Sequence, residues 1–179
     1  MLFDSFLKHK GRTFTVEVER DEDHGAPWDE EDGHGPVSDW TRRNKLPGEL
    51  VLWSTGNGSK RFYDFAAACK QAREESWNVA PYPAPGTESK RQQAARAAMA
   101  DFHHLRRWCG GLWEYVGVTV TDQLTGESES LWGVEDEPRA YLEEVARELA
   151  DQIIATVTDR EAAAIAASRP DMAPQESRA

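Results

Sequence analysis

Two pairs of β-rich segments, each joined by a turn too short to hold a helix, constrain the fold of this chain most strongly. The first pair is ELVLWST (49–55) and SKRFY (59–63), joined by Gly56-Asn57-Gly58; the second is LWEYVGVTVTD (112–122) and ESESLWGV (127–134), joined by a turn at Thr125-Gly126. Glycine and asparagine readily adopt the positive φ angles of tight hairpins. Because parallel strands need long crossover connections, both pairs are predicted to be antiparallel hairpins.

Alternation predicts one more strand, in RTFTVEVER (12–20), where Phe14, Val16 and Val18 share one face. Two other segments show no such alternation. Residues 21–40 are rich in acid, glycine and proline without periodicity, and residues 78–86 contain three prolines. Both segments are therefore predicted to be non-helical connections.

Apolar residues at gaps of three and four predict three helices. The first covers 65–77 behind Asp64, which suits a helix N-cap, and the second covers 88–109 behind Thr87. The third begins with Pro138 just inside it. Its predicted buried stripe is Leu142, Val145, Leu149, Ile153 and Val157.

This order of elements lacks the spacing of βαβ units and predicts an α+β fold. We expect a mostly antiparallel sheet of about five strands with three main helices packed on one face. A length of 179 residues suits one domain. We therefore expect a lead-in at 1–11, a single domain at 12–157, and an alanine-rich helical piece with a polar tail at 158–179.

Acidic side chains outnumber basic ones, 32 to 21, and they cluster. Residues 17–32 carry nine acids against one arginine, and residues 126–151 carry nine against two. Such runs are commonly solvated faces, but together they predict a surface that meets a basic partner. The candidate acidic residues are Glu19, Asp21, Glu22, Asp23, Asp29, Glu30, Glu31, Asp32, Glu144, Glu148 and Asp151.

Residues 88–107 have the opposite balance, with five basic and two acidic side chains. Together with Trp108, this helix is the alternative candidate, a surface for RNA or single-stranded DNA. Duplex DNA binding through the acidic segments is disfavoured, because phosphates require positive contacts. The candidate basic residues are Arg42, Arg43, Lys60, Arg61, Lys90, Arg91, Arg106 and Arg107.

Familiar catalytic motifs are absent from the sequence, so an enzyme is not the favoured interpretation. The acidic loop from Asp21 to His34 offers carboxylates and imidazoles, yet it lacks the EF-hand pattern. We therefore predict no metal and no cofactor. The two cysteines, Cys69 and Cys109, lie on apolar helix stripes and are predicted to be buried and unpaired.

Three stretches resemble a group of small proteins encoded by tailed bacteriophages and prophages. They are GAPWDEEDGHGPVSDWTRRNKLPGEL (25–50), GSKRFYDFAAACKQAREESW (58–77) and ESLWGVEDEPRAYLEEVARELADQII (129–154), with DGHGPVSDW, RFYDF and SLWG as the most specific phrases. The chain departs from the group's pattern at Glu135–Arg139. The resemblance implies a phage gene product that acts inside a bacterial cell. It carries no catalytic residues over to this chain.

These observations favour a phage-encoded, non-enzymatic protein that binds and modulates a host protein complex, for example an anti-CRISPR or anti-restriction factor. The alternative is a nucleic-acid-associated accessory protein, and a small enzyme or metal-binding protein that uses the loop at 21–34 ranks third. The sequence contains no apolar run long enough to span a membrane, and its start does not have the pattern of a secretory signal. We therefore expect the protein in the cytoplasm of the bacterial host.

Overall fold

The structure, a computed structural model, describes residues 3–30, 33–79 and 86–168. Within these ranges it contains four helices and seven strands, and the strands form two antiparallel sheets. The chain divides into two compact units. Unit 1 comprises residues 1–22 and 115–179, and unit 2 comprises residues 23–114.

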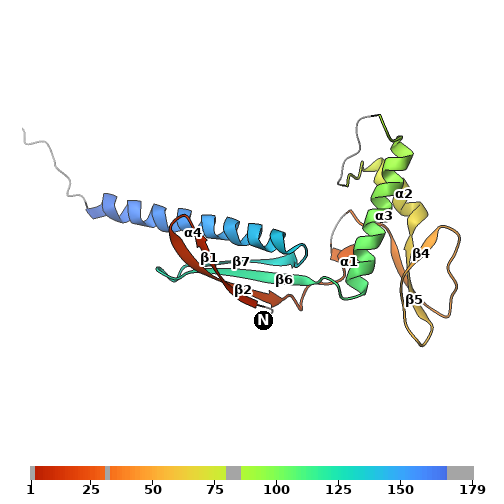
Figure 1. The fold of residues 1–179 in the computed structure, drawn as a ribbon, viewed down its shortest axis with the longest axis horizontal. Helices are drawn as coiled ribbons and strands as arrows, with labels where there is room; N and C mark the ends of the chain where they lie inside the picture. The colour runs from red at the N-terminus through yellow and green to blue at the C-terminus, as the bar shows by residue number, and fades with distance from the viewer. Residues whose placement is uncertain (1–2, 31–32, 80–85, 169–179) are drawn as a thin grey trace, which may run out of the picture. The chain divides into compact units, whose positions relative to one another are not determined.

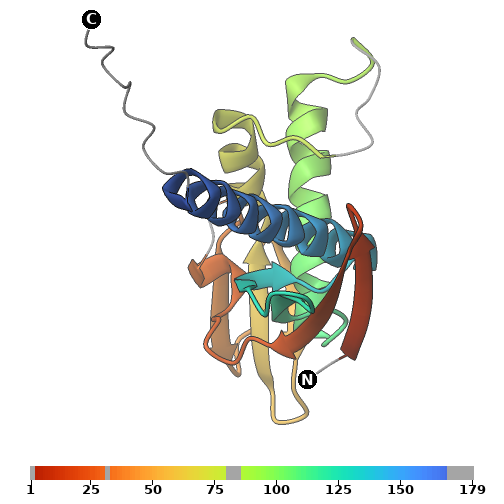
Figure 2. The same cartoon turned by 90° about the vertical axis from the view of Figure 1, so that its left-hand side faces the viewer.

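Unit 1 is a four-stranded antiparallel sheet with one long helix on it. Its strands are β1 (Phe3–His9), β2 (Arg12–Arg20), β6 (Tyr115–Asp122) and β7 (Ser128–Glu135), in the order β1-β2-β6-β7. The helix α4 (Arg139–Ser168) lies along one face of this sheet (Figure 1). Figure 2 shows the same arrangement from a second direction.

The core of unit 1 follows directly from the two periodicities in the sequence. Phe14, Val16 and Val18 of β2 are buried in alternation, and Val16 and Val18 have buried register partners on β6, Val120 and Val118. The predicted stripe of α4 packs against them, and every one of its five residues is buried, which confirms that prediction. Among the described residues of unit 1, no helix lies on the opposite face of the sheet, where Phe6 of β1 is exposed.

Asp122, at the end of β6, is completely buried and holds the turn to β7. Its carboxylate accepts hydrogen bonds from the Leu124 N–H and the Thr125 hydroxyl, and it pairs with Arg12 at an N–O distance of 2.5 Å. Burial by itself would raise the pKa of Asp122, but these three donors outweigh it and hold the pKa below its ordinary value. The turn is therefore stabilised by the ionised form.

The chain leaves and re-enters the sheet of unit 1 at adjacent points. The Asp21 N–H donates to the Tyr115 carbonyl at 2.9 Å, directly after β2 and at the start of β6. The Asp21 carboxylate also accepts from the Gly133 N–H of β7. Unit 2 is thus inserted between two strands that are neighbours in the sheet of unit 1.

Unit 2 contains a three-stranded antiparallel sheet in the order β3-β5-β4, with helices against one face. Its elements are α1 (Pro27–Glu30), β3 (Val37–Thr41), β4 (Glu49–Ser54), β5 (Ser59–Asp64), α2 (Phe65–Glu74) and α3 (Lys90–Cys109). The core gathers Leu52 and Tyr63 from the sheet and Ala98, Phe102 and Leu105 from α3. The hairpin predicted around Gly56-Asn57-Gly58 is confirmed.

The helix caps of unit 2 confirm one prediction and correct another. Asp64 caps α2, since its carboxylate accepts from the Ala67 N–H at 2.9 Å. The cap of α3, however, is Ser89 rather than Thr87. Ser89 is followed three residues later by Gln92, and the two form a reciprocal capping box, a pairing that Thr87 and Lys90 cannot make.

The predicted mixed α+β class with antiparallel strands is confirmed, but its detail differs. The single sheet of about five strands is wrong, because the described residues form two sheets and include two further strands, β1 in the predicted lead-in and β3 in the predicted loop. The predicted domain at 12–157 contains all of unit 2 and part of unit 1. The third helix begins at Arg139, after Pro138, and continues through the alanine-rich piece to Ser168.

Candidate functional site

A groove of about 820 Å³ lies in unit 2 between β4 and the C-terminal part of α3. One wall is formed by β4 residues 51–54. The other wall is formed by the α3 residues His103, Arg106 and Arg107, followed by Gly110 and Leu112 beyond the helix end. The groove therefore combines strand backbone, apolar side chains and positive charge.

The local sequence explains why these side chains face the groove. In β4, Leu52 points into the core and is 3% exposed, whereas Trp53 is 48% exposed. The register between β4 and β5 shifts at this point, between Val51 and Trp53. Gly110 and Gly111 end α3, and the following Leu112 remains 65% exposed. Exposed Trp53 and Leu112 make the groove partly apolar.

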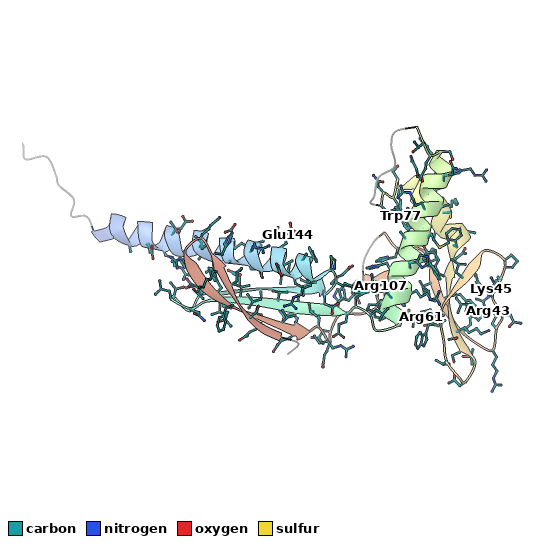
Figure 3. All side chains as sticks on the ribbon, in the orientation of Figure 1. Arg43, Lys45, Arg61, Trp77, Arg107 and Glu144 are labelled. Carbon is teal, nitrogen blue, oxygen red and sulfur yellow. The ribbon has the colours of Figure 1, made fainter. Side chains whose placement is uncertain are left out.

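Arg106 and Arg107 are both exposed near the end of α3, and Arg106 lies one turn after the buried Phe102. The Arg106 guanidinium lies over the Phe102 ring at 6.0 Å. Figure 3 shows Arg107 in the C-terminal half of the helix. Cations in the last helical turn also suit the negative end of the helix dipole.

Among the eight candidate basic residues, Arg43 and Arg61 form ion pairs with carboxylates of unit 2. Arg61 makes a two-pronged ion pair with Asp39, at 2.7 and 2.8 Å, and lies 4.6 Å over the Trp28 ring. The hydrogen bond from Arg61 lowers the pKa of Asp39, so this pair stays charged. Arg61 therefore joins β5 to β3 and α1 and does not line the groove.

Arg43 fastens the loop between β3 and β4. Its guanidinium lies over the rings of Trp40 and Phe62, at 4.5 and 4.4 Å, and donates to both carboxylate oxygens of Glu49 at 2.9 Å. The bonds from Arg43, with that from the Leu46 N–H, lower the pKa of Glu49. Figure 3 shows Arg43 in this loop with Lys45 nearby. We interpret this clamp as structural.

The remaining basic candidates are spread over unit 2. Lys90 and Arg91 begin the 20-residue helix α3, and Arg106 and Arg107 lie near its end, which separates the two pairs by roughly 25 Å along the axis. Arg42 follows β3, and Lys60 lies on β5. Of the eight candidates, only Arg106 and Arg107 line the groove.

The acidic candidates at the end of β2 and in the segment after it are divided between the units. Glu19 alternates with buried Val18 and so points to the face of the unit 1 sheet that α4 does not cover. Asp21 and Glu22 follow on the same unit. Asp23, Asp29 and Glu30 belong to unit 2, and Glu31 and Asp32 lie outside the described residues.

The acidic candidates of α4 lie on the other face of the unit 1 sheet. Glu144 and Glu148 are exposed, and Figure 3 shows Glu144 on the side of α4 away from the sheet. Asp151 is bound to the β1–β2 turn, with Lys10 at 2.8 Å and His9 at 2.6 Å, and these bonds lower its pKa. Within unit 1 the structure therefore does not bring the strand and helix acids to one face.

A buried polar network that sequence reasoning missed joins α3 to β5 and the segment before β3. The Asp101 carboxylate accepts from the Tyr63 hydroxyl at 2.7 Å and the Gly35 N–H at 2.8 Å, and it contacts His34 Nδ1 at 2.6 Å. Burial, together with Asp101, raises the pKa of Tyr63, so the phenol stays protonated. His34 also stacks with His104 at 6.0 Å. This network positions the backbone that enters β3.

The two cysteines are unpaired, as predicted, but they are only partly buried. Both pack against the core of unit 2. Burial raises the pKa of the Cys69 thiol. Burial also raises that of Cys109, although Arg61 Nη1, 3.9 Å from its sulfur, partly opposes the effect.

Because the thiolate is the reactive form, we expect both cysteines to react with a bulky maleimide at least about tenfold more slowly than a free thiol near pH ~7.5. Mass spectrometry of timed samples measures the rates, and the protein unfolded in denaturant is the control, in which both thiols should react fully. Fast labelling of both thiols in the folded protein would show that burial does not protect them.

Among the described residues, no group of three or more His, Cys, Asp and Glu side chains is placed to hold a metal ion. Nor is any helix in the described part of the chain long and apolar enough to cross a membrane. No family model matches the chain, and no curated protein or solved structure shows significant similarity to it.

Proposed function

We propose that this chain is a non-enzymatic, phage-encoded protein that binds and modulates a host protein complex through the acidic surface of α4. The observation that carries the proposal is the division of charge between the units. Unit 1 holds 19 acidic and nine basic side chains, whereas unit 2 holds 13 acidic and 12 basic ones. A basic partner would therefore be attracted more strongly to unit 1 than to unit 2.

The outer side of α4 supports this proposal most directly. Glu144 and Glu148 are one turn apart on the exposed side of the helix, where like charges repel each other by roughly 0.2–0.5 kcal/mol. The nearby Asp151 is engaged with the β1–β2 turn and keeps this part of α4 against the sheet. Rigid, exposed carboxylates of this kind increase the association rate with a basic surface at low salt.

We expect the double variant Glu144→Lys and Glu148→Lys to weaken capture of the host partner by about tenfold or more, because two attractions become repulsions. The tagged protein is used to purify partners from host lysate at about 0.05 M and about 0.5 M salt, with quantification by mass spectrometry. The partner should be recovered mainly at low salt.

The matched control is the double variant Asp159→Lys and Glu161→Lys, which makes the same charge change on exposed positions of the same helix. It should retain most of the binding. Equal capture by the wild-type protein and by both variants would show that the acidic surface of α4 does not bind the partner.

The alternative function, a nucleic-acid-associated accessory protein, has one observation in its favour. Arg106 and Arg107 line the same groove as the exposed Trp53, and charge with an aromatic ring is the usual composition of single-strand binding surfaces. Against it, Arg43 and Arg61 are engaged with carboxylates, and Lys90 and Arg91 lie near the other end of α3. The eight basic candidates thus form no continuous track.

A further inference from the structure

The strand β4 has an open edge. It is the outermost strand of the sheet β3-β5-β4, so only one of its sides is hydrogen-bonded. The Thr55 N–H donates to the Ser59 carbonyl at 2.9 Å, and alternation along an antiparallel pair then leaves the backbone N–H and C=O of Ser54 facing outward. Outside the sheet, no backbone hydrogen bond joins residues 51–54 to another described residue.

This open edge is one wall of the groove described above, and α3 is the other wall. A groove between an edge strand and a helix is the geometry in which an extended peptide can add to a sheet. The peptide backbone would pair with residues 51–54, and every second side chain would enter the groove. The apolar side chains of Trp53 and Leu112 offer contacts there.

The charge of the groove determines which peptides fit. Arg106 and Arg107 lie along the α3 wall with His103, and among the described residues that line the groove none is acidic. A peptide with acidic side chains on its groove-facing side would be attracted, and a basic peptide would be repelled. Arginine also forms two-pronged hydrogen bonds with carboxylates.

We propose that the groove between β4 and α3 binds an extended acidic segment of a partner protein, which adds as a fourth strand at the edge of β4. A peptide fits better than a single nucleic-acid strand for two reasons. The open edge presents carbonyl oxygens as well as N–H groups, and carbonyl oxygens repel phosphates. The groove also contains one exposed aromatic side chain, Trp53, where single strands use successive stacking surfaces. This site is on unit 2 and does not depend on the acidic surface of α4.

The test is selection of binders from a library of random peptides of about ten residues against the full-length protein. We expect selected peptides to carry acidic residues at alternate positions. On binding, the outward-facing amide hydrogens of residues 51–54, that of Ser54 among them, should exchange at least about tenfold more slowly, because strand addition protects them. Hydrogen-exchange mass spectrometry measures this change.

Two variants separate the backbone contribution from the charge contribution. Ser54→Pro removes one outward N–H, which an edge strand tolerates, and Arg106→Glu with Arg107→Glu reverses the charge. Each should weaken the binding of a selected peptide by about tenfold or more. The controls are Ser54→Ala and the pair Lys90→Glu with Arg91→Glu at the other end of α3. Their affinity for the peptide should stay within about twofold of the wild-type value.

Several outcomes would overturn the proposal. They are a selection without binders, peptide binding that neither variant weakens, and peptide binding without slower exchange at residues 51–54. The last measurement uses the wild-type protein and so decides the matter even if Ser54→Pro does not fold. Displacement of a selected peptide by an oligothymidylate of about ten nucleotides would assign the groove to nucleic acid. Self-association abolished by the arginine variant would assign it to a second copy of the chain.

Discussion

Replacing Gly35 with alanine is expected to lower the free energy of unfolding of unit 2 by about 3 kcal/mol, because the added methyl group has no space. A Cβ at this position would lie 2.5 Å from the Tyr63 hydroxyl and 2.6 Å from the Ala68 Cβ. Tyr63 and Ala68 are both fully buried, so neither can move aside. Relief would require displacing Tyr63 from Asp101 and thus breaking the network that also holds His34.

The measurement is urea unfolding followed by circular dichroism, with hydrogen exchange to assign the loss to unit 2. The control is Gly56→Ala, since Gly56 has no atom within 4 Å of an added Cβ, and its effect should stay within about 0.5 kcal/mol. If Gly35→Ala were as stable as the control, the close packing of Gly35 against Tyr63 would be wrong.

Replacing Asp122 with alanine is expected to destabilise unit 1 by about 3 kcal/mol, because Arg12 would lose its buried partner. The Leu124 N–H and the Thr125 hydroxyl would also lose their acceptor, and the turn between β6 and β7 would loosen. Faster hydrogen exchange in β6, β7 and the turn, with residues 33–79 unchanged, would localise the effect. A loss confined to unit 2 would contradict this prediction.

Because Asp122 must be ionised to hold the turn, the free energy of unfolding of unit 1 is expected to fall in acid. In the unfolded chain Asp122 titrates near its ordinary value of about 3.9, and in the folded protein its pKa is lower. The stabilisation is therefore complete above about pH 4 and is lost as the pH falls through the folded pKa. Asp122→Asn should flatten the dependence of unfolding free energy on pH in this range, which unfolding curves from about pH 2 to 6 would measure.

The elements that were predicted correctly are those whose signal is local. The alternation in 12–20, the hairpin glycines and the spacing on α4 each depend on neighbours within a few residues. Strand β1 was missed because its apolar Phe6 lies on the exposed face and its polar Ser5 on the core face, so apolar and polar residues do not alternate. Strand β3 was missed because it lies within a segment rich in glycine and proline. The two-unit organisation depends on pairing between residues distant in sequence, such as Val16 and Val120.

Only one wall of the candidate groove could be predicted from the sequence. Arg106 and Arg107 were identified by their charge, but their proximity to β4 depends on how α3 packs over Leu52. The other wall had no clear signal. In ELVLWST, strict alternation would place Trp53 on the face opposite Leu52, and the register shift between Val51 and Trp53 that changes this cannot be read from the sequence. Asp101 gave no signal either, because its partners lie at least 38 residues away.

The bond between Asp21 and Tyr115 has a consequence for the way this architecture can change over time. Since β2 and β6 are already neighbours, an ordinary hairpin turn would be enough to connect them, and unit 2 takes the place of that turn. A module attached at two adjacent points can be lengthened, replaced or lost without altering which strands pair. Unit 1, which holds the proposed partner surface on α4, can then keep its strand pairing while the groove of unit 2 changes independently of it.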